Sequence, residues 1–214
     1  MKLYTYFRSS AAYRVRIALN LKGLDYEAVP VHLVRGGGEH RQPAYLGLNP
    51  AGLVPALEDQ GQVLTQSLAI IEYLEESHPQ PALLPAAPLD RARVRAIAQA
   101  IACDIHPVNN LRVLQYLTRE LDASEEQKNA WYRHWIGVGL QAVEAMLAGD
   151  ARTGAFCHGD TPGLADCCLV PQVFNARRFG CELAAMPTVL RIAETCAGLE
   201  AFHRAAPEAQ PDAE

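Results

Sequence analysis

The sequence predicts two structural parts, a small α/β domain over residues 1–78 and an all-helical domain over residues 89–207. Apolar residues in the first part alternate between the period of a strand and that of a helix, whereas the second part keeps the helical period throughout. Four prolines fall within residues 78–88, and proline interrupts a helix because it lacks the backbone N–H donor. We therefore expect residues 79–88 to form an extended linker between the two domains.

The first part begins with a strand, a helix and a second strand. Residues Lys2–Phe7 alternate in the manner of a strand, and Ser10–Lys22 places apolar residues on one helical face before Gly23 closes the helix. Residues Asp25–Val31 are again rich in β-forming side chains. This order predicts a parallel pair of strands joined by a right-handed crossover.

A hairpin and another helix complete the first part. Residues 48–57 start with turn residues and run into a short strand, Gly61 provides the turn, and residues 63–65 supply the returning strand. Residues Ser67–Ser77 are expected to form a helix with an apolar inner face. The complete order, β-α-β-α-β-β-α, fits a thioredoxin-like domain and also fits other small α/β folds.

The second part is expected to consist of helices at about Leu89–Tyr116, Ser124–Leu147, Gly163–Asn175 and Pro187–Thr195. Trp131 and Trp135 lie one helical turn apart, and we expect them to pack in the core rather than to line a ligand site. Residues 208–214 form a tail that we expect to be disordered.

Composition excludes several classes of function. A formal net charge of −5 argues against nucleic acid as a partner. The chain has no long apolar run and no signal-peptide core, so we expect a soluble cytoplasmic protein with no membrane segment. The six cysteines form no C-x-x-C pair and are expected to be reduced core residues. The seven histidines show no metal-ligand spacing, so no metal site is expected.

The turn between the first strand and the first helix carries the clearest functional signal. Ser9 and Ser10 stand at this turn, and the first turn of a helix leaves up to four backbone N–H groups without intrahelical partners. Two hydroxyl groups and the positive end of the helix dipole would favour a small anion there, such as a thiolate or a carboxylate. The alternative is that one of the serines merely caps the helix.

Four motifs in a fixed order resemble a known family. They are Tyr6–Ser10 with Arg14–Leu19, Leu48–Pro50 with Val54-Pro55, Gln66–Glu76, and Leu169–Val173 with Asn175-Ala176 and Arg178-Phe179. Together they resemble the zeta-class glutathione transferases, which include the maleylacetoacetate and maleylpyruvate isomerases. The resemblance spans nearly the whole chain. It implies the glutathione transferase fold, in which an N-terminal thioredoxin-like domain precedes an all-helical C-terminal domain, with glutathione as cofactor and a homodimeric state.

The resemblance also implies which residues hold glutathione. Val54-Pro55 looks like the family's cis-proline turn, which leaves the Val54 backbone exposed to pair with the cysteinyl backbone of glutathione. Gln66 and Ser67 match the site of the γ-glutamyl carboxylate, although an ordinary helix cap is the alternative. The other family contacts fall on His40 for the glycyl end, although a loop histidine can simply be solvated, and on His106 and Asn110.

Two departures from the family pattern affect the expected chemistry. The family often reads Ser-Ser-Cys-Ser at the first turn, whereas Ala11 and Ala12 follow the two serines here. This removes the protein thiol that reductive dehalogenation would use, but isomerisation needs only the thiol of glutathione. Gly163 replaces the usual Ser or Thr at a helix N-cap, which costs only a few tenths of a kcal/mol.

The implied activity is cis–trans isomerisation of a small dicarboxylate keto acid in aromatic catabolism. Arginine suits a carboxylate, and Arg8 lies beside the expected thiolate site. The resemblance places Arg178 as the distal carboxylate clamp, and the alternative for Arg178 is a surface ion pair with Glu182. Arg112 would add a third positive group, which favours maleylpyruvate as substrate and fumarylpyruvate as product, unless Arg112 points to solvent. Maleylacetoacetate isomerisation, general glutathione conjugation and a non-catalytic binding module remain the alternatives.

Overall fold

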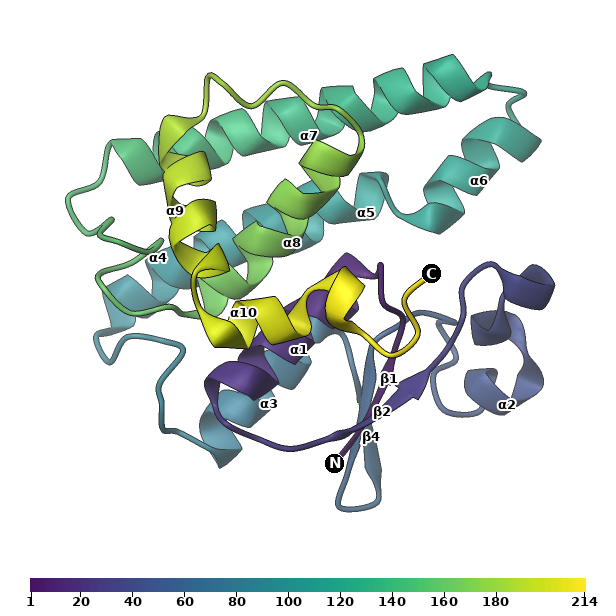
Figure 1. Ribbon diagram of the computed structural model, residues 1–214, viewed down its shortest axis with the longest axis horizontal. Helices are drawn as coiled ribbons and strands as arrows, with labels where there is room; N and C mark the ends of the chain where they lie inside the picture. The colour runs from purple at the N-terminus through teal and green to yellow at the C-terminus, as the bar shows by residue number, and fades with distance from the viewer. The chain divides into compact units, whose positions relative to one another are not determined.

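The computed structural model describes residues 1–214 and divides into two compact units (Figure 1). The first unit comprises Met1–Leu83 together with Ala197–Glu214, and the second comprises Leu84–Cys196. The sequence placed residues 197–207 in the helical domain, but their contacts are with the first unit, because α10 (Glu200–Ala205) packs along α1 (Ser10–Leu21).

The first unit is built on a mixed sheet of four strands. They are β1 (Lys2–Thr5), β2 (Glu27–Pro30), β3 (Ala56–Asp59) and β4 (Gln62–Thr65), in the order β2-β1-β3-β4. Strand β1 runs parallel to β2 and antiparallel to β3, and β3 pairs with β4 as a hairpin. The predicted parallel pair and hairpin are therefore confirmed, and this is the thioredoxin-like arrangement.

Helices α1 and α3 (Ser67–Ser77) pack against each other, and the interior of this unit is apolar, with Leu3, Ile17 and Leu57 fully buried. Between β2 and β3 lie two short 3₁₀ turns, Arg35–Gly37 and Glu39–Arg41, and the short helix α2 (Pro43–Leu46). This connection carries His40.

Helix α1 buries charge as well as apolar surface. The Arg16 side chain is fully buried, and its guanidinium donates to Thr5 Oγ1 at 3.0 Å, Phe7 O at 2.9 Å and Ala205 O at 3.0 Å. Burial lowers the pKa of Arg16 to about 10, which still leaves the group charged at neutral pH. Arg16 therefore ties the end of β1 to α10.

The second unit is helical. Its elements are α4 (Pro88–Gln99), a π-helical segment (Ala100–Ile105), α5 (His106–Val108), α6 (Leu111–Arg119), α7 (Glu125–Ala148), α8 (Leu164–Arg178) and α9 (Pro187–Ala197). The last three confirm the predicted helices. None of the helices is both long enough and apolar enough to cross a bilayer.

The predicted continuous helix from Leu89 to Tyr116 is wrong. The regular α-helical pattern gives way to the π-helical segment just before Pro107, and a new helix starts at Leu111. Pro107 has no N–H to bond the preceding turn, so the chain changes its hydrogen-bonding pattern there.

Helix α8 starts at Gly163 with its first turn intact, as predicted. The buried Asp166 carboxylate accepts from the backbone N–H groups of Cys157 and Gly163, each at 2.9 Å. Burial raises the pKa of Asp166, and these hydrogen bonds oppose that rise.

Two groups of side chains are less buried than expected. All six cysteines are free, and four of them are buried as expected, but Cys103 is exposed and Cys181 is half-buried. Trp131 donates from Nε1 to Val108 O at 2.9 Å and packs edge-on against Trp135, whose side chain is 37% exposed. The prediction of core packing is therefore wrong for Cys103 and for Trp135.

The expectation of a disordered tail is also wrong. Residues Pro207–Ala209 form a 3₁₀ turn, and the buried Gln210 donates from Nε2 to Arg204 O and Ala206 O, both at 2.9 Å. Asp212 and Glu214 then bond to Phe7 and Arg35, in the N-terminal part of the same unit. Polar side chains of the tail supply these contacts.

Candidate functional site

Ser9 is the N-cap of α1. Its Oγ accepts from the Ala12 N–H at 3.2 Å, and its own backbone N–H donates to Tyr6 O at 2.9 Å. The capping alternative thus holds for Ser9, but a hydroxyl that accepts one hydrogen bond keeps its O–H as a donor. Ser10 is the first helical residue and is 5% exposed, whereas Ser9 is half-buried.

Arg8 precedes these serines and is held by two aromatic rings. Its Nη2 donates to the Tyr6 hydroxyl at 2.9 Å, and its Cζ lies 4.8 Å from the centre of the Phe7 ring. Attraction between a guanidinium and an aromatic face orients the cation without neutralising it. A fixed positive charge therefore adjoins the N-terminus of α1.

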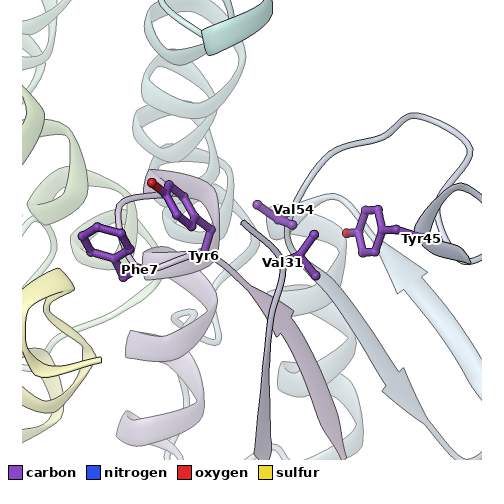
Figure 2. Packing of buried hydrophobic residues seen from close by; sticks show 5 residues of the cluster. All are labelled: Tyr6, Phe7, Val31, Tyr45 and Val54. Atoms are coloured by element: carbon purple, nitrogen blue, oxygen red, sulfur yellow. The ribbon is translucent and has the colours of Figure 1, made fainter. Parts of the chain in front are cut away.

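The turn between β1 and α1 packs against the loop before β3. Tyr6, Phe7, Val31, Tyr45 and Val54 form one buried apolar cluster, and Figure 2 shows Val31 and Val54 between Tyr6 and Tyr45. The cluster therefore brings the cis-proline loop to the turn that carries the two serines.

The loop around Val54 is fixed by the Leu48-Asn49-Pro50 motif. The Val54–Pro55 peptide bond is cis, as predicted. Just before it, Leu53 O accepts from Tyr45 Oη at 2.6 Å and from Asn49 Nδ2 at 2.7 Å. These two bonds hold the carbonyl of the residue that precedes Val54.

Gln66 and Ser67 open helix α3 in an uncommon way. Gln66 has φ 68° and ψ 116°, a conformation that residues other than glycine rarely adopt, and no side chain caps the helix. Such backbone strain costs about 1–3 kcal/mol and occurs most often at functional sites. The ordinary-cap alternative does not describe Gln66.

Arg14 adds a buried positive charge beside Ser67, and it was not among the site residues expected from the sequence. From α1 its Nη1 donates to Ser67 Oγ at 3.2 Å, and both side chains are buried. A guanidinium here adds positive charge to the N-terminus of α3, which already favours an anion. The sequence did offer a hint of this role, because Arg14 lies in the first of the four motifs shared with the family.

His40 is buried rather than solvated, and its Nδ1 is buried without a hydrogen-bond partner. Burial lowers the pKa of His40, and Arg41 adds to this effect, so the ring is neutral at pH 7. Gly38, with φ +104°, leaves room for the ring, because a Cβ there would lie 2.4 Å from His40 Cε1. The alternative that His40 is simply a solvated loop histidine is therefore wrong.

The second unit carries the other four candidates. His106 begins α5 directly after the π-helical segment, and Asn110 caps α6, with Oδ1 accepting from the Arg112 N–H at 3.2 Å. Arg112 is exposed in the first turn of α6. Arg178 ends α8, is exposed, and has its Cζ 5.1 Å from the centre of the Phe179 ring.

Comparison with known proteins places the chain in one family. The model of the glutathione S-transferase N-terminal domain matches residues 3–82. The maleylacetoacetate isomerase of Pseudomonas aeruginosa is 57% identical over 213 residues, covering 99% of this chain and 98% of that protein.

Two solved structures agree over the full length of both chains. A holo maleylpyruvate isomerase, described as a bacterial zeta-class glutathione S-transferase, is 53% identical with a TM-score of 0.97. The maleylacetoacetate isomerase of Methylobacterium extorquens AM1, with bound malonate and glutathione, is 45% identical with a TM-score of 0.96. The chain therefore belongs to the glutathione transferase family, within the zeta-class group of maleylacetoacetate and maleylpyruvate isomerases.

Proposed function

We propose that this protein is a glutathione-dependent cis–trans isomerase that converts maleylpyruvate to fumarylpyruvate. The observation that carries the proposal is the first turn of α1, where a serine O–H, a helix N-terminus and the Arg8 guanidinium occur together. Glutathione supplies a thiolate that adds to the conjugated double bond, allows rotation about the resulting single bond, and leaves unchanged. The protein then has to stabilise a thiolate and to hold a dianion.

The first unit fits glutathione at three places. The γ-glutamyl carboxylate meets the N-terminus of α3, where Gln66 and Ser67 lie and Arg14 adds positive charge. The cysteinyl backbone pairs with Val54 beside the cis-proline. The neutral His40 ring has a buried nitrogen without a partner, which suits a polar contact with the glycyl end. From the second unit we assign His106 and Asn110 as further glutathione contacts.

Thiolate stabilisation is within the capacity of these groups. Lowering a thiol pKa from about 8.5 to about 7 takes roughly 2 kcal/mol. A helix N-terminus contributes about 0.3–1 kcal/mol, and a hydrogen bond to a charged group about 1.5–3 kcal/mol. The O–H of Ser9 together with α1 is sufficient, and Ser10 supplements it.

The substrate's carboxylates require cations. We assign Arg8 and Arg178 to them, because a guanidinium binds a carboxylate through two parallel hydrogen bonds. Both arginines have an aromatic ring beside the guanidinium, Phe7 for Arg8 and Phe179 for Arg178. Glu182, the alternative partner for Arg178, accepts from the Ala184 N–H through Oε1 at 2.9 Å. The malonate bound in the Methylobacterium extorquens relative supports a site for dicarboxylates.

Arg112 supports maleylpyruvate over maleylacetoacetate. Maleylpyruvate is the shorter dianion, so a third cation near its keto acid end stabilises it more. The Asn110 cap fixes the backbone at Arg112, and because the exposed side chain also fits the solvent alternative, Arg112→Ser is the deciding variant. Loss of a direct charged contact costs about 1.5–3 kcal/mol, so Arg112→Ser should lower kcat/KM for maleylpyruvate by about 10- to 100-fold. Equal small losses on both substrates would contradict this choice.

Isomerisation of maleylacetoacetate is the second candidate, because the relative from Pseudomonas aeruginosa carries that name. General conjugation of electrophiles to glutathione is distinguished by its stoichiometry. The test is to incubate each maleyl keto acid with the protein and to measure free thiol and double-bond absorbance together. Isomerisation leaves the thiol concentration constant, whereas conjugation consumes one thiol per substrate.

The setting of this reaction is a further part of the proposal. We place the enzyme in the cytoplasm, where glutathione keeps thiols reduced, in line with six free cysteines, and in a route of aromatic catabolism. We also propose a homodimer, for which Leu89, 81% exposed at the start of α4, provides apolar surface. Light scattering during size-exclusion chromatography would show a mass near that of a single chain if the homodimer proposal is wrong.

A further inference from the structure

Residues Pro207–Glu214, here called the C-terminal strap, follow α10 within the first unit and contact its N-terminal part at two places (Figure 1). Asp212 Oδ2 accepts from the backbone N–H of Phe7 at 3.0 Å. Glu214 Oε1 accepts from Arg35 Nη2 at 2.7 Å. Neither contact belongs to the glutathione or substrate residues assigned above.

The first contact completes a clamp on the turn that leads into Ser9. The Phe7 carbonyl accepts from the buried Arg16, and the Phe7 N–H donates to Asp212, so both polar groups of Phe7 are held. Burial lowers the pKa of Arg16, and Asp212 is the smallest of the effects that oppose this fall. The backbone of Phe7 therefore joins the side chains of Asp212 and the buried Arg16.

The second contact reaches the loop that precedes His40. His32 Nδ1 accepts from the backbone N–H groups of Val34 and Arg35, at 3.1 and 2.7 Å. The other ring nitrogen, Nε2, lies 3.3 Å from Glu214 Oε1, without the geometry of a hydrogen bond. Glu214 thus joins both His32 and Arg35 to the strap.

We propose that the C-terminal strap is a positioning element for the glutathione site, with Asp212 as its main positioning residue. Asp212 sets the Phe7 to Ser9 turn, and Glu214 sets the loop before His40. This inference rests on the proposed function for its effect on glutathione, but the ordering of the turn is a property of the protein alone.

The expected effect follows from the burial of Phe7, which is 4% exposed. Without Asp212 its N–H is a buried donor with no partner, and the turn shifts to expose it to water. A displacement of about 1 Å at a reacting group can lower the rate by about 100-fold. We expect a smaller effect here, a fall in kcat/KM of roughly 10-fold, because Ser9 keeps its own cap.

The experiment compares Asp212→Ala, Asp212→Asn and Glu208→Ala. The asparagine keeps an oxygen that accepts from Phe7 while removing the charge, and Glu208 is an exposed acid of the same strap, which makes Glu208→Ala the matched control. The readouts are hydrogen exchange at Phe7 in the ligand-free protein, the pH titration of the ultraviolet band of bound glutathione thiolate, and kcat/KM for maleylpyruvate.

In Asp212→Ala we expect faster exchange at Phe7 and a higher pKa of the bound thiol. In Asp212→Asn, the exchange rate at Phe7 and the pKa of the bound thiol should both return most of the way to the wild-type values. Glu208→Ala should match the wild type in both. Unchanged exchange in Asp212→Ala would overturn the clamp, and faster exchange with an unchanged thiol pKa would overturn its link to glutathione. If the wild-type protein binds no glutathione, the proposed function is refuted, and so is the effect of Asp212 on a glutathione site. The exchange comparison would still decide whether Asp212 holds the turn at Phe7.

Discussion

Ser9 has two separable roles, and Ser9→Ala removes both. The loss of the O–H donor to a thiolate costs about 1.5–3 kcal/mol, which raises the pKa of the bound glutathione thiol by about 1–2 units. The loss of the 3.2 Å cap on the Ala12 N–H lowers the free energy of unfolding by about 0.5–2 kcal/mol. Ser10→Ala should change the thiol pKa less, because Ser10 lies inside the first turn and is buried.

Ser9→Asp separates the two roles. A carboxylate accepts the cap hydrogen bond and suits a helix N-terminus, so the unfolding free energy should stay near the wild-type value. The same carboxylate repels a thiolate, so glutathione should bind only as the neutral thiol. The assays are the ultraviolet thiolate band as a function of pH and denaturant unfolding. The reasoning is refuted if Ser9→Ala leaves the thiol pKa unchanged, or if Ser10→Ala raises it more.

Three further changes have defined outcomes. Gly38→Ala forces a Cβ against the His40 ring and should weaken glutathione binding. Gly36→Ala is also at positive φ but in open space, so it should only destabilise the protein. Equal calorimetric affinities for glutathione in the two variants would contradict this role of Gly38. Asp166→Ala leaves two buried backbone N–H groups without their acceptor and should cost about 3 kcal/mol in denaturant unfolding, and a loss below about 1 kcal/mol would show that α8 does not depend on this cap. The pKa of His40 is lowered by folding, so the unfolded state takes up a proton first as pH falls below about 6.5, and stability should decline there. His40→Asn should flatten this part of the stability profile, and a curve that keeps the wild-type slope would assign the proton to another group.

The regular elements could be predicted because their periodicity reports burial. The parallel strands, the hairpin and helix α3 follow directly from alternation and turn residues. The periodicity did not reveal the π-helical segment before Pro107, since apolar residues continue through that region. The Val54-Pro55 pair could be identified as cis only through the family resemblance.

Buried charge was the main source of error at the site. Arg14 and Arg16 look like the solvated face of a basic helix, yet both are buried and hydrogen-bonded to polar oxygen atoms that come from other parts of the fold. Gln66 gives no sign in the sequence of its positive φ. Asp212 lies in a short polar segment, and its contact with Phe7 joins residues 205 positions apart. Such long-range polar contacts leave no periodic pattern.

The most direct measurement follows the maleyl double bond of maleylpyruvate by proton NMR, with the protein and glutathione both far below the substrate concentration. The proposed function predicts complete conversion to the fumaryl isomer through many turnovers per glutathione, with the free thiol unchanged at the end. Conversion that stops after one equivalent of glutathione, or that proceeds equally well without glutathione, would contradict isomerisation by reversible thiolate addition.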